Sequence, residues 1–227
     1  MTIEHTRRLV AEALGTGLIV MAVIGSGIMA TNLSPNDVGL QLFENAFATA
    51  AALLALILVF GPVSGAHFNP VVTLVSRGFG HHSNTEAAGY IGAQVIGGCV
   101  GAVVANVMFS LPAVELSTKA RTGGALWLSE GIATLTLLLI IWGLVRSGRS
   151  QAVPFAVAAW IGGAYFFTSS TSFANPAVTI ARTLSDTFAG IKPSSAPMFI
   201  AMQLVGAVVA FGLILFLFPR EGGHRDS

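Results

Sequence analysis

Six long apolar stretches, separated by polar segments, form the main hydropathy pattern of the chain. A helix needs about 20 mostly apolar residues to cross the hydrocarbon core of a bilayer. Stretches close to this length cover Leu9–Ala30, Leu40–Phe60, Ala87–Phe109, Ala125–Val145, Ala152–Thr168 and Ala196–Phe218. The fifth stretch is the shortest, so we expect its helix to extend to either side. The pattern predicts an all-α membrane protein with six transmembrane helices.

Two long connections, residues 61–86 and 169–195, do not fit this count because each contains a short apolar piece. The pieces are Pro70–Val75 and Pro176–Leu184, and neither is long enough to span a bilayer. Each can dip into the membrane as a half-helix if its backbone is buried in protein or lines water. We therefore expect two re-entrant half-helices in addition to the six spans.

The two halves of the chain repeat each other. Three motifs of the first half recur in the same order in the second: Glu12–Thr16 as Glu130–Thr134, Asn69–Leu74 as Asn175–Ile180, and Ala93–Gly97 as Met202–Gly206. Each half contributes an odd number of spans, so the second half is predicted to lie upside down relative to the first. Inverted repeats place their shared site near the bilayer midplane. We predict one domain, residues 1–227, with repeats over about residues 8–109 and 125–218.

Each half-helix is expected to begin at an Asn-Pro pair. Asparagine is a preferred N-cap and proline is favoured at the first helical position. Two half-helices entering from opposite sides would meet start to start, and each start carries about half an elementary positive charge. That charge disfavours a cation in the gap, while the asparagine amides can donate to a passing oxygen. The candidate site is therefore the paired set Asn69, Pro70, Val71 and Asn175, Pro176, Ala177.

The segment Ser64–Thr73, together with Asn175-Pro-Ala, resembles the two signature loops of aquaporins and glycerol facilitators, the major intrinsic protein family. Glu12 and Glu130 also match that family, and the resemblance covers about residues 8–218. It implies an aquaporin-like channel domain in which the spans and half-helices form a right-handed bundle. It also implies a homotetramer in which each subunit has its own pore for small neutral solutes and water.

Three ionisable residues lie at membrane depth in this prediction. Carboxylates inside apolar spans, such as Glu12 and Glu130, are costly and by default functional, for example as a proton relay. The alternative, which the resemblance favours, is that they accept hydrogen bonds from the loop backbone. His67, two residues before Asn69, either lines the inner pore mouth or is a structural histidine.

The selectivity filter departs from the family's pattern. Family members usually carry arginine directly after the second Asn-Pro-Ala, where this chain has Val178. The family's spacings put the other filter positions at Thr49, Gly163 and Ser172, or at Phe173 if the last count slips by one residue. Strict water channels have an aromatic residue, a histidine, a small residue and an arginine there. The filter implied for this chain is wide and lacks the guanidinium that adds a positive barrier.

This filter resembles that of a bacterial aquaglyceroporin branch associated with arsenic-resistance genes. The branch suggests passive, bidirectional diffusion of glycerol-like polyols, arsenic oxyacids including methylated forms, and water. A water-selective aquaporin is the alternative, and an ion-coupled secondary transporter is a further one. Arg182, near the end of the second half-helix, is interpreted as a loop or surface contact.

Composition agrees with a membrane location. The chain is 54% hydrophobic and only 9% charged, whereas a soluble domain carries about a quarter charged residues. A net charge of +1 without a basic run argues against a nucleic-acid partner. A single cysteine, Cys99, excludes an intrachain disulfide or a multi-cysteine metal site. No motif for a cofactor, a metal or enzymatic catalysis is present in the sequence.

The cationic residues predict the orientation of the chain. With the N-terminus inside, cytoplasmic segments hold Arg7, Arg8, Arg77, Arg146, Arg149, Arg220 and Arg225, and outer segments hold Lys119, Arg121, Arg182 and Lys192. The excess on the inner side agrees with the positive-inside rule. We expect a multi-pass protein of the cell membrane, a bacterial inner membrane, with both termini in the cytoplasm.

Overall fold

The computed structural model describes residues 2–219 as a helical bundle, without strands in that range. The long helices are α1 Ile3–Leu33, α2 Val38–Ser64, α4 Asn84–Met108, α5 Gly124–Arg146, α6 Val153–Phe167 and α8 Ala196–Leu217. Two short helices, α3 Pro70–Gly78 and α7 Pro176–Ala181, lie among them. Single 3-10 turns cover Ser150–Ala152, Arg182–Leu184 and Pro193–Ser195.

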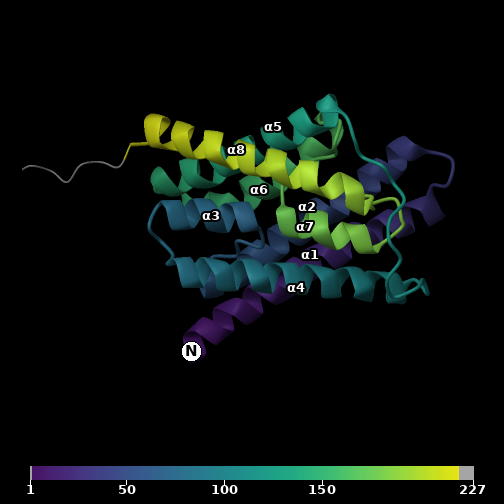
Figure 1. Cartoon of the computed structure of the whole chain (residues 1–227), viewed down its shortest axis with the longest axis horizontal. Coiled ribbons are helices and arrows are strands. Elements are labelled where there is room, and N and C mark those ends of the chain that lie inside the picture. The colour runs from purple at the N-terminus through teal and green to yellow at the C-terminus, as the bar shows by residue number, and fades with distance from the viewer. Residues whose placement is uncertain (1, 220–227) are drawn as a thin grey trace, which may run out of the picture.

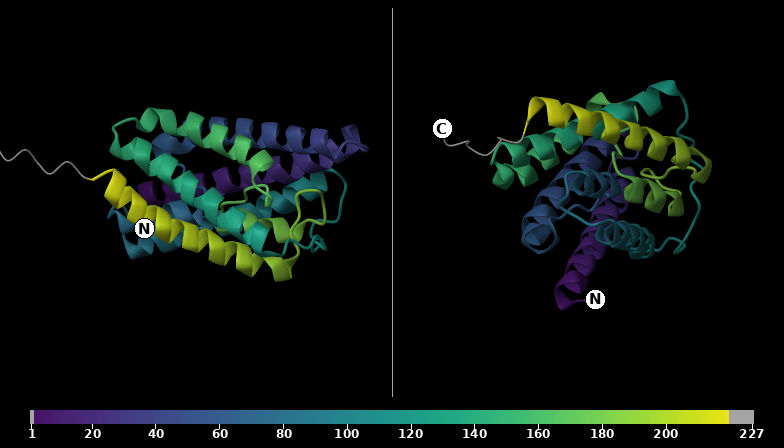
Figure 2. Two further views of the ribbon diagram at one scale, coloured as in Figure 1. Left: turned by 90° about the horizontal axis from the view of Figure 1, so that it is seen from above. Right: turned by 60° about the vertical axis from the view of Figure 1, so that its left-hand side comes forward.

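Figure 1 shows both described chain ends at one end of the bundle, on the left. We call this the termini end and the opposite one the far end. The short helix α3 lies toward the termini end and α7 toward the far end. The long helices are tilted against one another, with loops at both ends of the bundle (Figure 2).

Each predicted span is a helix, but the fifth one differs from its prediction. Helices α1, α2, α4, α5 and α8 with its preceding turn are long and apolar enough to cross a membrane. Helix α6 has 15 residues and is extended only at its start, by the turn Ser150–Ala152. It ends at Phe167, and the next residue, Thr168, has a β-type backbone conformation. From there the chain continues as the loop that leads to α7.

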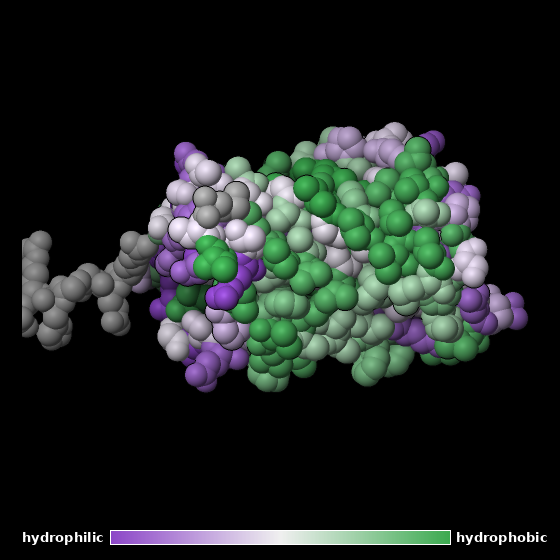
Figure 3. Space-filling model, turned by 90° about the horizontal axis from the view of Figure 1, so that it is seen from below, coloured by the Kyte–Doolittle hydropathy of each residue, from purple (hydrophilic) through white to green (hydrophobic). Residues whose placement is uncertain are grey.

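The outer surface of the bundle is apolar, as the composition predicts. Figure 3 shows a face that is largely hydrophobic along its middle, with hydrophilic residues gathered at the two ends. Large side chains such as Phe47, Val208 and Phe216 are mostly exposed. Exposed apolar surface on this scale is unfavourable in water, so the outer surface of the bundle is suited to lipid.

Glycines let two pairs of long helices cross closely. A side chain on Gly97 of α4 would collide with the carbonyl oxygen of Ala13 in α1, and one on Gly101 with that of Gly17. In the second half, a side chain on Gly206 of α8 would collide with the carbonyl oxygen of Gly131 in α5. Such small-residue crossings are how membrane helices pack. The α1–α4 and α5–α8 crossings therefore correspond, as an inverted repeat predicts.

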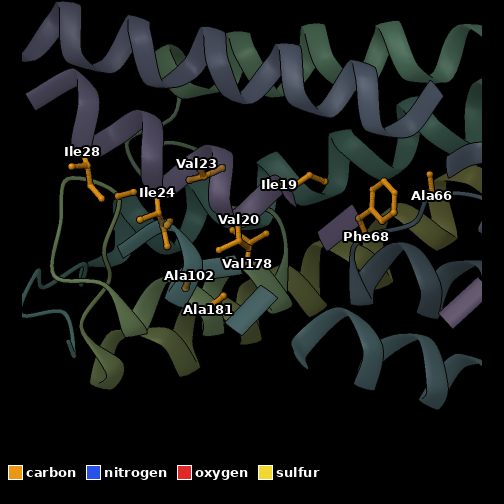
Figure 4. Packing of buried hydrophobic residues seen from close by; sticks show 12 residues of the cluster. Ile19, Val20, Val23, Ile24, Ile28, Ala66, Phe68, Ala102, Val178 and Ala181 are labelled. Atoms are coloured by element: carbon orange, nitrogen blue, oxygen red, sulfur yellow. The ribbon is translucent and has the colours of Figure 1, made fainter. Parts of the chain in front are cut away.

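An apolar cluster fixes α7 and the loop before α3 against α1. The cluster joins α1 to α4, to the loop before α3 and to α7, through Ile19, Val20, Val23, Ile24, Ala102, Phe68, Val178 and Ala181. Figure 4 shows the α1 side chains in a row beside the others. This packing holds α7 and the loop that leads into α3 on the same helix.

Candidate pore

The two half-helices begin at their Asn-Pro pairs, and the starts are fastened to each other. Asn69 Oδ1 accepts from the Val71 N–H at 3.1 Å, and Asn175 Oδ1 accepts from the Ala177 N–H at 3.0 Å. Asn69 Nδ2 donates across to the carbonyl oxygen of Ala174, and Asn175 Nδ2 donates to that of Phe68, both at 2.8 Å. Each amide group has two N–H donors, so one remains on each asparagine for another oxygen.

The loops leading into the half-helices have the same unusual backbone. In the first loop Ala66 and Phe68 have positive φ, and in the second Ser172 and Ala174 do. Non-glycine residues seldom adopt this region, and each costs of order 1–3 kcal/mol unless its surroundings hold it. The loops therefore need strong external partners.

Glu12 and Glu130 are those partners. Both carboxylates are fully buried. Glu12 accepts from Ser64 Oγ at 2.6 Å, His67 N at 3.0 Å, Phe68 N at 2.7 Å and Gln94 Nε2 at 2.7 Å. Glu130 accepts from Phe173 N at 2.9 Å, Ala174 N at 3.0 Å and Gln203 Nε2 at 2.7 Å. The geometry is that of loop support, and neither glutamate lines the main cavity.

Gln94 and Gln203 are residues that sequence reasoning missed. Besides binding its glutamate, each donates to a half-helix threonine at 3.0 Å, Thr73 for Gln94 and Thr179 for Gln203. Each glutamine thereby joins a long helix, a glutamate and a half-helix. The signal was present in the sequence, because both glutamines belong to the repeated motif of the third and sixth spans.

We expect Glu12→Gln to lower the stability of the folded protein. The new amide would place an NH₂ group against N–H donors, and losing a buried acceptor costs about 1–3 kcal/mol. Thermal unfolding in detergent measures the effect. Glu4→Gln is the control, because Glu4 lies in the same helix but is exposed and bound only to Arg8. A Glu12→Gln protein that folds normally but loses a proton-dependent uptake would favour the transporter alternative.

A cavity of about 860 Å³ runs beside the half-helices. Its wall includes Arg8 and His82 near the termini end, both asparagines, Asn69 and Asn175, and then Arg182. The wall is mostly apolar elsewhere. The cavity thus leads from the termini end past the two helix starts and toward the far end.

The structure brings most of the counted filter residues together in the wall of this cavity. Thr49, Ser172, Phe173 and Val178 all line it, so the lining of the cavity does not decide between Ser172 and Phe173 as the filter residue. Gly163 does not line it. That glycine is exposed and lies in a separate groove on the outer face of the bundle.

Tyr165 occupies the place that the spacing assigned to Gly163. It lines the cavity, and its hydroxyl lies 3.1 Å from Thr49 Oγ1. Two positions along an α-helix correspond to a rotation of about 200° around its axis. Gly163 and Tyr165 therefore lie on opposite faces of α6. Counting back from Asn175 fails because the intervening loop is irregular. A tyrosine in an otherwise apolar span was the available signal.

His67 combines the two roles left open for it. It lines the cavity, and its Nδ1 lies 3.1 Å from Thr73 Oγ1. Its ring lies 5.0 Å from the ring of His82 and 5.5 Å from that of Tyr90, measured between centroids. The termini end of the cavity is therefore bordered by aromatic and imidazole rings.

The interpretation of Arg182 as a surface contact is wrong, whereas a loop contact is present, because its Nε donates to the carbonyl oxygen of Ala189 in the loop after α7. Its side chain is only 2% exposed and lines the cavity. Arg182 follows Val178 by four residues, so the two share a helix face, and helical side chains lean toward the helix start. Its guanidinium carbon lies 3.4 Å from the Phe173 ring centroid. The cavity wall is therefore not free of arginine, although position 178 is.

The chain is similar to known proteins over nearly its whole length. The model of the family described as Major intrinsic protein matches residues 1–170 and 149–226. The aquaglyceroporin AqpS of Rhizobium meliloti is 50% identical over 214 residues, which are 94% of this chain and 91% of AqpS. The probable aquaporin AqpM of Archaeoglobus fulgidus is 27% identical over 96% of this chain and 99% of its own.

A solved structure shares the fold. The X-ray structure of the aquaglyceroporin from Plasmodium falciparum matches with a TM-score of 0.72 and 22% sequence identity. The match covers 92% of this chain and 95% of that one. At this identity the likeness bears on the fold alone.

Proposed function

Since the chain belongs to the major intrinsic protein family, we propose that its pore carries uncharged solutes of about the size of glycerol. The chain is a multi-pass membrane channel for passive movement of small solutes, and not an enzyme. The proposed solutes are glycerol-like polyols, arsenic oxyacids including methylated forms, and water. The whole of residues 1–227 would act as one channel domain made of the two repeats.

The observation that carries this proposal is the small side chain at position 178. Val178 lines the cavity one helical turn from Asn175, at the position where the family usually has arginine. Beside it the wall offers hydroxyl groups from Thr49 and Tyr165. The small side chain leaves room for a branched solute. The wall hydroxyls both donate and accept hydrogen bonds, which suits polyols and uncharged oxyacids because both carry several hydroxyl groups.

The paired motifs supply the second part of the proposed pore. Asn69, Pro70 and Val71 would form one helix start there, and Asn175, Pro176 and Ala177 the other. The spare N–H of each asparagine would donate to a passing solute oxygen. The two partial positive charges disfavour cations, which supports a pore for neutral solutes.

Location and assembly follow the family resemblance. We propose a bacterial inner membrane with the termini end in the cytoplasm, supported by Arg7, Arg8, Arg77, Arg146 and Arg149 at that end. Arg220 and Arg225 lie outside the described residues. We also propose a homotetramer with one pore per subunit. The cavity lined by residues of one chain supports the second part of this proposal, a pore within each subunit.

A water-selective pore is the second candidate. One observation favours it, namely that Arg182 is stacked on Phe173 in the cavity wall. An aromatic ring and a guanidinium both belong to the filter of strict water channels. The two candidates differ in whether glycerol passes.

Stopped-flow measurements on proteoliposomes test the proposal. We expect water, glycerol and arsenous acid to equilibrate faster than in protein-free vesicles, and none to accumulate against its gradient. Accelerated water flow with glycerol at the background rate would replace the proposal with the water-selective candidate. Accumulation driven by an ion gradient would replace it with a secondary transporter.

A further inference from the structure

Arg182 is a buried cation without a direct ion pair. Its Nε donates to the carbonyl oxygen of Ala189. No hydrogen bond from its terminal nitrogens to another residue is present within residues 2–219. The salt bridge found in that range joins Arg8 and Glu4. Because guanidinium has five N–H donors and the side chain lines the cavity, donors remain for an oxygen inside the cavity.

Two acidic side chains of this part of the bundle, Glu130 and Asp186, are engaged elsewhere. Glu130 accepts from the loop N–H groups of Phe173 and Ala174. Asp186 accepts from the backbone and hydroxyl of Thr118 at 2.9–3.1 Å. The charge of Arg182 is therefore not cancelled by a contacting anion, and its field acts on the cavity.

Two further cations strengthen the positive field at the far end. The guanidinium carbon of Arg121 lies 5.0 Å from the same Phe173 ring, and Arg121 is held by the carbonyl oxygen of Gly190 at 2.9 Å. Burial, together with the charges of Arg121 and Arg182, lowers the pKa of Lys119 to about 8. A cation approaching from the far end meets this field before it reaches the half-helix starts.

We propose that Arg182, held on the Phe173 ring, is the specificity-determining cation in the far-end part of the cavity, in place of the residue at position 178. Its guanidinium excludes cationic solutes and donates hydrogen bonds to solutes with acceptor oxygens. This proposal rests on the proposed channel function and adds to it the residue that sets charge selectivity. Val178 is part of the arrangement, because a larger residue one turn away would crowd the Arg182 side chain.

The test compares methylammonium, a small cation, with glycerol and water in proteoliposomes. We expect the wild-type protein to keep methylammonium flux near background. Arg182→Gln keeps much of the side-chain length and removes the charge, so its methylammonium-to-water permeability ratio should rise roughly tenfold or more. Arg182→Lys keeps the charge and should stay near the wild-type ratio. Lys192→Gln removes an exposed cation outside the cavity wall and should change nothing.

An unchanged ratio in Arg182→Gln, with water flow retained, would overturn the proposal and leave Arg182 a structural residue. If Arg182→Gln does not fold, Phe173→Leu serves instead, since it removes the supporting ring and leaves the charge free to move. That variant should raise the methylammonium-to-water ratio severalfold, and an unchanged ratio would again overturn the proposal. If the wild-type protein does not carry glycerol, the proposed solutes are wrong. The proposal for Arg182 is still tested in that case, because its measurement is the ratio of methylammonium to water permeability.

Discussion

Val178→Arg should nearly abolish glycerol flux while reducing water flow much less. Val178 lines the cavity beside Thr49 and Phe173, and arginine there adds a long side chain with five donors. The new guanidinium would also lie one helical turn from that of Arg182, and the two like charges would spread apart across the remaining opening. Bulky solutes lose their passage first. The measurement is the ratio of glycerol to water permeability in vesicles with matched protein content.

Two controls separate narrowing from misfolding in this experiment. Val178→Leu adds bulk without charge and should lower glycerol flux only moderately. Circular dichroism and size-exclusion chromatography show whether each variant is folded and assembled. A folded Val178→Arg protein with the wild-type permeability ratio would mean that position 178 does not face the constriction.

Gly97→Ala should be among the most destabilising single methyl additions in the first repeat. The added carbon would collide with the carbonyl oxygen of Ala13, which is backbone and cannot rotate away. The helices α1 and α4 must then separate, and overpacking of this kind costs about 1–3 kcal/mol. The measurement is the detergent-induced unfolding midpoint, with the recovered yield of folded protein as a second readout.

Gly92→Ala is the matched control for this change. It lies in the same helix, and no other group lies within 4 Å of the position that its side chain would take. The same substitution there should leave the midpoint unchanged or slightly raise it, because alanine is the better helix former. Equal midpoints for the two variants would show that α1 and α4 can move apart without loss of stability. Close packing of these two helices would then not stabilise the fold.

Local signals in the sequence predict the half-helices well. Both begin at the proline after an asparagine, as predicted, because N-cap preference and the fixed φ of proline act over a few residues. The partners of Glu12 and Glu130 were predictable in kind for a similar reason. A buried carboxylate needs donors, and the nearby loop backbone supplies them.

Features that depend on an irregular loop were not predictable in this way. Counting twelve residues back from Asn175 gave Gly163 instead of Tyr165, since a loop has no fixed rise or rotation per residue. The surface position predicted for Arg182 was wrong because the prediction placed its charge where its backbone lies, near the end of the half-helix. A long side chain carries the guanidinium several ångströms from its Cα, and stacking on Phe173 then fixes where it lies.

The crossed hydrogen bonds of the two asparagines have a consequence for how the protein is made. Asn69 is bound to a residue 105 positions later, and Asn175 to one 107 positions earlier. During synthesis the first half therefore leaves the ribosome with Glu12 and Gln94 in place but without the carbonyl group of Ala174 that Asn69 binds. Contacts so distant in sequence form late in folding. The hydrogen bonds that join the first re-entrant segment to the second are therefore expected to form only after the second half has been inserted.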